Sequence, residues 1–165
     1  MMRIFTLMVT FGALWWVPSP KTRQTPLPLA FSVERVDESS DPFVARLRLQ
    51  LTNDDSTAHR LIVPLEWPAP ALLLISVEDQ DGRALPLQAP PGGPSGVPTR
   101  WAVELPPHGF VGADLFVPLT DQGKGPRFVL HPAVPYRMII AVRVIDAETG
   151  RGSQLLEDTI PVRIP

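Results

Sequence analysis

The acidic segment Glu78–Gly82 has the residue types of a calcium-binding loop. An EF-hand loop that started at Asp79 would need oxygen ligands at its fifth and twelfth positions. Arg83 and Pro90 stand at those positions, so the segment lacks the ligands of such a loop. Asp81–Gly82 is typical of a hairpin turn, and the sequence therefore predicts a solvated turn here.

Two further acidic clusters and three histidines are the remaining candidate metal ligands. Asp37–Asp41 and Asn53–Asp55 could share a cation at one end of a folded domain, but short polar segments between apolar runs are typical of turns. His59, His108 and His131 lie far apart in the chain, and none has a histidine partner two or four residues away. With scattered histidines and no cysteine, the sequence predicts no metal site and no cofactor.

Nucleophilic catalysis also lacks a recognisable motif. The absence of cysteine excludes a thiolate nucleophile. A serine elbow needs Gly-x-Ser-x-Gly between a strand and a helix, and in Gly92–Gly96 the second glycine comes one place early. No phosphate-binding or dinucleotide fingerprint is present. Two of the 17 acidic residues could converge as a glycosidase pair, but no spacing marks such a pair. No catalytic residue is predicted, and we expect a protein that is not an enzyme.

The elements that would position any site are β-strands. From about residue 29, apolar and polar residues alternate with a period of two. In the first clear strand, Phe43, Ala45, Leu47, Leu49 and Leu51 share one face. The nearly continuous apolar run Ala71–Val77 is expected to be a central strand. The predicted strands cover residues 43–51, 59–67, 71–77, 100–105, 111–117, 136–146 and 156–164.

Prolines decide between the all-β architectures. The chain has 21 of them, and no window outside the first twenty residues has the 3.6-residue apolar repeat of a capped helix. Pro64, Pro118 and Pro161 each remove a ladder donor, so their strands are expected at sheet edges or bulges. A closed barrel has no edges. The sequence therefore predicts an immunoglobulin-like, two-sheet antiparallel sandwich of about seven to nine strands.

The N-terminal residues predict export. Arg3 precedes the apolar run Ile4–Val17, which Pro18–Pro20 ends, and these are the parts of a secretory signal peptide. We assign residues 1–20 to that signal, residues 21–28 to a Pro-rich tether, and residues 29–165 to the sandwich. The mature protein is expected in the periplasm or outside the cell. An uncleaved N-terminal anchor is the alternative, and this segment would then be its only contact with the membrane.

Several short segments resemble a known group of domains. Leu51–Asn53 ends a strand, an Asp-Gly turn follows, Leu105–Gly109 precedes another strand, and Tyr136–Ile139 leads into a final hairpin. This order resembles immunoglobulin-like modules of bacterial envelope proteins, over about residues 30–164. The resemblance implies the sandwich fold and a binding or structural role. It transfers no site residues, and the cysteine pair of antibody domains is absent here.

These observations favour a non-catalytic exported interaction module, with another envelope or secreted protein as its partner. The net charge of −2 offers no basic face for nucleic acid. An edge strand or an end loop could make the contact. The alternative is a protease inhibitor that presents the proline-stiffened loop Gln88–Pro98, which is otherwise a long connection between sheets. Trp67 and Trp101 could bind a sugar or peptide, but both are in phase with apolar core positions.

Overall fold

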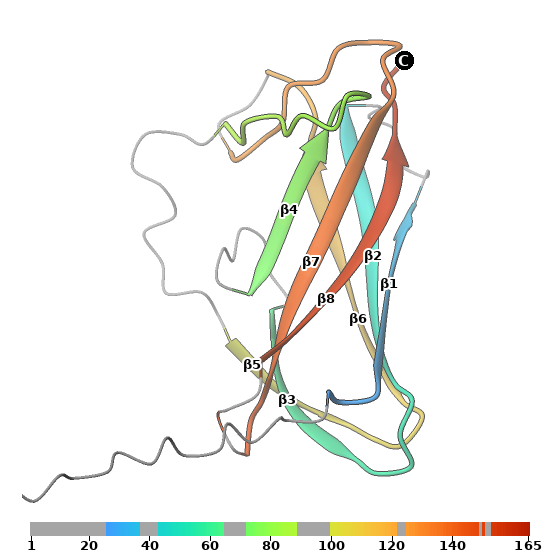
Figure 1. The fold of residues 1–165 in the computed structure, drawn as a ribbon, viewed down its shortest axis with the longest axis vertical. Helices are drawn as coiled ribbons and strands as arrows, with labels where there is room; N and C mark the ends of the chain where they lie inside the picture. The colour runs from blue at the N-terminus through green and yellow to red at the C-terminus, as the bar shows by residue number, and fades with distance from the viewer. Residues whose placement is uncertain are drawn as a thin grey trace, which may run out of the picture.

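The computed structural model describes residues 26–36, 43–64, 72–88, 100–121, 125–148, 150 and 153–165. These residues form eight β-strands and no helix, which confirms the predicted all-β class. No helix in these ranges is therefore long and apolar enough to cross a bilayer. All strand pairs are antiparallel, and the strands form two sheets that pack as a sandwich (Figure 1).

The smaller sheet has three strands in the order β1–β2–β6. They are β1 (Leu29–Arg35), β2 (Val44–Asn53) and β6 (Phe110–Pro118). In β2 the residues at 45, 47, 49 and 51 are buried and Arg48 is exposed, as the alternation predicts. We call this the small sheet.

The larger sheet is built around β7 (Tyr136–Asp146). On one side β7 pairs with β8 (Ser153–Val162). On the other side its first half pairs with β4 (Leu73–Glu78) and its last residues pair with β3 (His59–Pro64). β3 also pairs with β5 (Arg100–Leu105). We call this the large sheet.

The core lies between the two sheets and is made by the inward positions of the alternating strands, together with buried apolar residues outside the strands. Burial of these apolar side chains is the main favourable term in folding. Among the described residues, the largest side chains that are almost fully buried are Phe128, Leu47, Leu61, Leu73, Leu105, Leu119, Met138, Ile140 and Ile164.

The expectation for residues 71–77 is wrong in one respect. Within the described ranges, β4 pairs with β7 alone, so it is not a central strand. Leu73 and Val77 are buried, but Leu74 is 46% exposed on the outer face of the large sheet. Leu74 lies opposite Ala141 in the β4–β7 register, so its apolar character reflects contact with an apolar neighbour strand rather than burial on both faces.

Pro118 stands where a strand can lose an amide at little cost. Asn53 N donates to Gly109 O at one end of the β2–β6 pair, and Leu119 N donates to Phe43 O at the other. Backbone groups alternate in direction along a strand, so the odd-numbered residues of β6 bond to β2. The backbone of Pro118 therefore points away from β2, where no ladder donor is lost.

The other two prolines follow the same rule. Arg143 N donates to Leu72 O, so odd-numbered residues of β7 face β4 and even-numbered ones face β8. Pro161 lies opposite Arg137, and its backbone therefore points away from β7, at the edge of the large sheet. Pro64 is the last residue of β3, beyond the two positions that pair with β7. Pro118 and Pro161 lie on edge strands, as predicted. The prediction that Pro64 marks an edge strand is wrong, because β3 lies between β7 and β5 in the large sheet.

One carboxylate joins the edges of the two sheets on the β1–β8 side. Asp158 Oδ2 accepts a hydrogen bond of 2.7 Å from Val33 N on β1. Asp158 Oδ1 accepts one of 2.8 Å from Thr159 N on its own strand. Both amides point away from their ladders, so Asp158 satisfies one unpaired donor from each sheet.

We expect Asp158→Ala to lower the free energy of unfolding by about 1–3 kcal/mol, because it leaves the partly buried Val33 amide without its acceptor. Asp158→Asn should cost less, because the amide oxygen still accepts one bond. Urea denaturation at neutral pH measures both. Exposed Glu157→Ala is the matched control, and a control as unstable as Asp158→Ala would contradict the edge-joining role.

Candidate functional site

The Asn53–Asp55 cluster is a structural feature of a turn. The Asn53 side chain is fully buried, and its Nδ2 lies 2.8 Å from Thr57 O, 3.2 Å from Leu105 O and 3.0 Å from Pro106 O. Its Oδ1 accepts a 2.9 Å hydrogen bond from Asp55 N. One buried amide therefore ties the β2–β3 turn to the end of β5 in the other sheet.

Asp55 and His59 lie together in the same turn. His59 Nε2 is 3.1 Å from Asp55 Oδ2, and that oxygen also accepts a 2.8 Å hydrogen bond from the Thr57 hydroxyl. This hydroxyl, with the Ser56 amide and His59, lowers the pKa of Asp55. His108 contributes only its backbone, with N 3.3 Å from Asp55 O. The carboxylate is thus engaged by its own turn.

The other predicted candidates do not add to this cluster. Asp79 Oδ1 accepts hydrogen bonds from Asp81 N and Arg83 N, both 2.9 Å, and Gly82 has φ +77°, which confirms the predicted turn. His131 lies elsewhere, where its N contacts the Tyr136 hydroxyl at 3.1 Å. In the part of the chain that the structure describes, no three His, Asp or Glu residues are grouped as metal ligands.

Several sequence candidates lie outside the described residues. These are Asp37–Asp41, Gly92–Gly96, Trp67 and all of the loop Gln88–Pro98 except Gln88 itself. Trp101 belongs to β5, as its alternation predicts. The N-terminal signal and most of the tether also fall outside the described residues.

The strongest surface feature lies on β6 and was missed at the level of sequence. Phe110 is 68% exposed and Phe116 is 60% exposed, on the outer face of the small sheet. Phenylalanine is usually buried, so two exposed rings on one strand are unusual. The alternation of β6 contained the signal: residues 111, 113, 115 and 117 face inward, so the even-numbered phenylalanines must face outward.

Charged residues lie between the two rings. Asp114 Oδ2 is 2.7 Å from Arg46 Nη2, and its Oδ1 is 3.3 Å from Arg48 Nε, both across the β2–β6 pair. The Arg46 guanidinium carbon also lies 5.8 Å from the centre of the Phe116 ring, a cation–π distance. The hydrogen bond from Arg46, followed by that from Arg48, lowers the pKa of Asp114. The charge of Asp114 is therefore compensated within its own sheet.

In the part of the chain that the structure describes, no strand pairs with β6 on the side away from β2. The alternation established by the Asn53–Gly109 and Leu119–Phe43 bonds directs the N–H and C=O groups of residues 110, 112, 114 and 116 outward. The opening ends at Pro118, whose carbonyl accepts a 3.0 Å hydrogen bond from Phe128 N. We call residues 110–116 the open edge.

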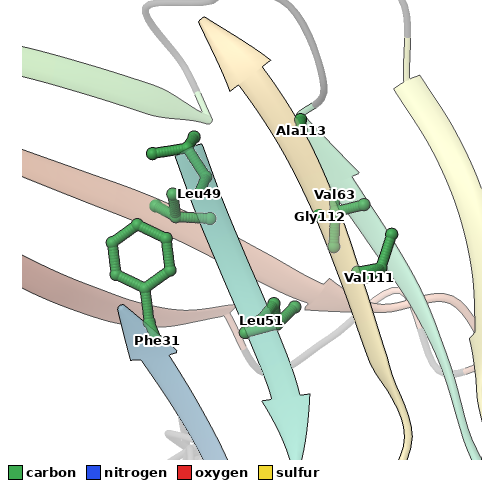
Figure 2. A pocket seen from close by; sticks show the side chains of 8 residues that line it. Phe31, Leu49, Leu51, Val63, Val111, Gly112 and Ala113 are labelled. Carbon is green, nitrogen blue, oxygen red and sulfur yellow. The ribbon is translucent and has the colours of Figure 1, made fainter. Parts of the chain in front are cut away.

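Among the described residues, the pocket behind the open edge is small. This pocket of about 20 Å³ is lined by Gly112, Ala113, Phe31, Leu49, Leu51, Val63, Val111 and Val142. Figure 2 shows it from close by. Sites for small organic ligands usually measure about 300–1,000 Å³. This void is the size of a single water molecule and has apolar walls. A binding function at this place must therefore use the surface.

The comparisons with known proteins name no family for this chain. No family model matches it, and no curated protein matches it. A putative ApaA protein from Bordetella pertussis is similar in structure, with a TM-score of 0.44 and 16% identity over 85% of this chain and 96% of that one. A β-glucuronidase from Bacteroides uniformis has a TM-score of 0.36 and 12% identity over 83% of this chain, which spans 13% of that enzyme.

We expect Asn53→Ala to lower the free energy of unfolding by about 3 kcal/mol, because several buried backbone groups lose their partner together. Thermal or urea denaturation measures the loss. Asp54→Ala is the control, since Asp54 is its exposed neighbour, and it should change stability little. Equal effects of the two substitutions would contradict the role assigned to Asn53.

Asp114 makes stability depend on pH in a defined direction. Its pKa in the folded chain lies below the ordinary value of 3.8, so the ionised group stabilises the fold above that value, and this contribution is lost as pH falls through the folded-state pKa. Asp114→Asn should therefore be less stable than the unchanged chain at pH 7, and the difference should shrink in acid below the ordinary value. A difference that grew on acidification would contradict this assignment.

Proposed function

We propose that this protein is a non-catalytic, exported interaction module of the bacterial cell envelope, with an immunoglobulin-like sandwich that binds an extended segment of a partner protein along β6. The observation that carries this proposal is the open edge. Its outward backbone groups are a template for pairing, and an added strand supplies both donors and acceptors.

The side chains around the open edge suit such a partner. In strand addition the backbone provides most of the affinity, and side chains on alternate positions provide specificity. Phe110 and Phe116 offer apolar contact at the two ends of the open edge, and each ring can bury area that is now in water. The Arg46–Asp114 pair between them favours a polar residue in the middle of the bound segment.

The cellular location rests on residues 1–20, which have the composition of a secretory signal. An exposed strand edge is an aggregation hazard, and a dedicated partner in the envelope would cover it. The alternative partner class, a protease held by residues 88–98, involves a different part of the chain and is an outcome of the test below.

The test is in-cell crosslinking of the C-terminally tagged chain, with capture from the envelope fraction and mass spectrometry. Phe116→Pro should reduce capture of the partner at least tenfold, because it removes the ring and the outward amide while leaving the β2 ladder intact, as Pro118 does. Phe116→Ala keeps the amide and should reduce capture less.

Leu155→Pro is the matched control, because residue 155 has the same outward orientation on β8 at the other sheet edge. It should leave capture unchanged. Undiminished capture by Phe116→Pro would contradict the β6 site. Crosslinks that join residues 88–98 of this chain to a protease would favour the inhibitor alternative. Recovery of the chain from the cytosol alone would contradict export.

A further inference from the structure

The open edge has a sequence that is complementary to itself. Phe110 and Phe116 lie three residues to either side of Ala113, and Gly112 and Asp114 lie one residue to either side. In an antiparallel pair centred at Ala113, each phenylalanine of one strand faces the other phenylalanine of the second strand. Gly112 faces Asp114 in the same arrangement.

The register centred at Ala113 pairs more residues of the open edge than the registers centred at Gly112 or Asp114 do. Backbone pairing requires outward residues on both strands, which on β6 are the even-numbered ones. Centred at Ala113, every outward residue from 110 to 116 pairs with another. Centred at Gly112, Phe116 would face His108, which lies in a turn with φ +54°. Centred at Asp114, Phe110 would face Pro118, which has no amide donor and whose carbonyl is already bonded to Phe128.

Charge favours the same register. Centred at Asp114, the pairing would place two aspartates directly opposite each other, and like charges in that position destabilise a sheet. Centred at Ala113, each Asp114 faces a glycine and keeps its own partners, Arg46 and Arg48. The two phenylalanine pairs lie at the rims of the contact, where aromatic cross-strand pairs are favourable.

We infer that a second copy of this chain occupies the open edge, through antiparallel β6–β6 pairing with a two-fold axis at Ala113. The two three-stranded small sheets then form one continuous six-stranded sheet in the order β1–β2–β6–β6–β2–β1. A two-fold axis makes the contact closed, so pairing stops at the dimer and does not propagate. The inference shares the edge with the proposed function but needs no other protein.

The area of this contact sets its strength. Four exposed phenylalanine rings and two strand edges bury about 1,000 Å² in total, which is at the lower limit for a specific protein interface. A contact of this small area is typical of transient association, so we expect the dimer to dissociate on dilution. An envelope partner with additional contacts can then replace the second copy.

Sedimentation equilibrium of the purified full chain, from micromolar to millimolar concentration, tests the inference. The unchanged chain should show a monomer–dimer equilibrium. Phe110→Glu/Phe116→Glu places like charges opposite each other and should weaken the dimer at least tenfold. Phe110→Lys/Phe116→Glu places opposite charges in register and should restore much of it. All variants retain residues 1–25, and Leu155→Glu is the control for an exposed leucine on the other sheet.

Cysteine crosslinking tests the register directly, because the chain has no cysteine of its own. Cα atoms of hydrogen-bonded antiparallel pairs lie about 5.5 Å apart, within the range of a disulfide. Phe110→Cys/Phe116→Cys should therefore form a covalent dimer on mild oxidation. Phe110→Cys alone should not, because residue 110 faces residue 116 of the second copy. The two positions are about 20 Å apart within one strand, so no internal disulfide competes.

A chain that stays monomeric at millimolar concentration would overturn the inference, and so would a dimer that both charge variants leave unchanged. Efficient crosslinking by Phe110→Cys alone would overturn the register. These results are independent of partner capture in cells. A purified dimer with no captured partner would support the self-pairing and contradict only the proposed function, whereas a monomer that captures a partner through β6 would do the reverse.

Discussion

The alternation of backbone groups along each strand is the constraint on which the rest of this structure depends. Every second residue bonds to one neighbour, and the residues between must find partners on the other side. A sandwich buries its apolar faces well, but each sheet ends in strands with half of their amides unpaired. The partners of those amides explain the positions of Pro118 and Pro161 and the role of Asp158. They also identify the open edge of β6.

The two sides of the small sheet differ in this respect. On the β1 side, Asp158 supplies an acceptor to Val33 and to Thr159, so the two sheets are joined by hydrogen bonds as well as by the core. On the β6 side, the side chains of Arg46 and Arg48 both contact the carboxylate of Asp114. As a result, the two sheets are hydrogen-bonded to each other on the β1–β8 side, whereas the open edge on the β6 side is available for pairing.

The fold was largely predictable, because alternation and proline placement are local properties. Inward positions such as Leu47 and Met138 could be assigned from the sequence, and so could the edge positions of Pro118 and Pro161. The central position assigned to residues 71–77 failed, because an apolar run does not distinguish burial on both faces from contact with an apolar neighbour such as Ala141. Strand order depends on contacts between distant residues, which no local pattern contains.

The candidate site was less predictable for the same reason. The sequence indicated that Asn53 is a turn residue. Its hydrogen bonds to the end of β5 form only when the two sheets pack together, so no local pattern predicts them. The Arg46–Asp114 pair likewise depends on the β2–β6 register. The sequence alone places Phe110 and Phe116 out of phase with the inward-facing residues of β6. Their meaning required knowing that, among the described residues, β6 pairs with β2 alone.

Gly112 has a consequence for how this edge can change in evolution. Proteins commonly protect an open strand by placing a lysine or another charged residue at its centre. A Cβ atom at position 112 would lie 3.1 Å from Leu49 O, so any side chain there would require the neighbouring strand to shift. A mutation that places a charged side chain at position 112 would therefore also disturb the small sheet. Descendants of this sequence should keep the glycine and vary its flanking residues.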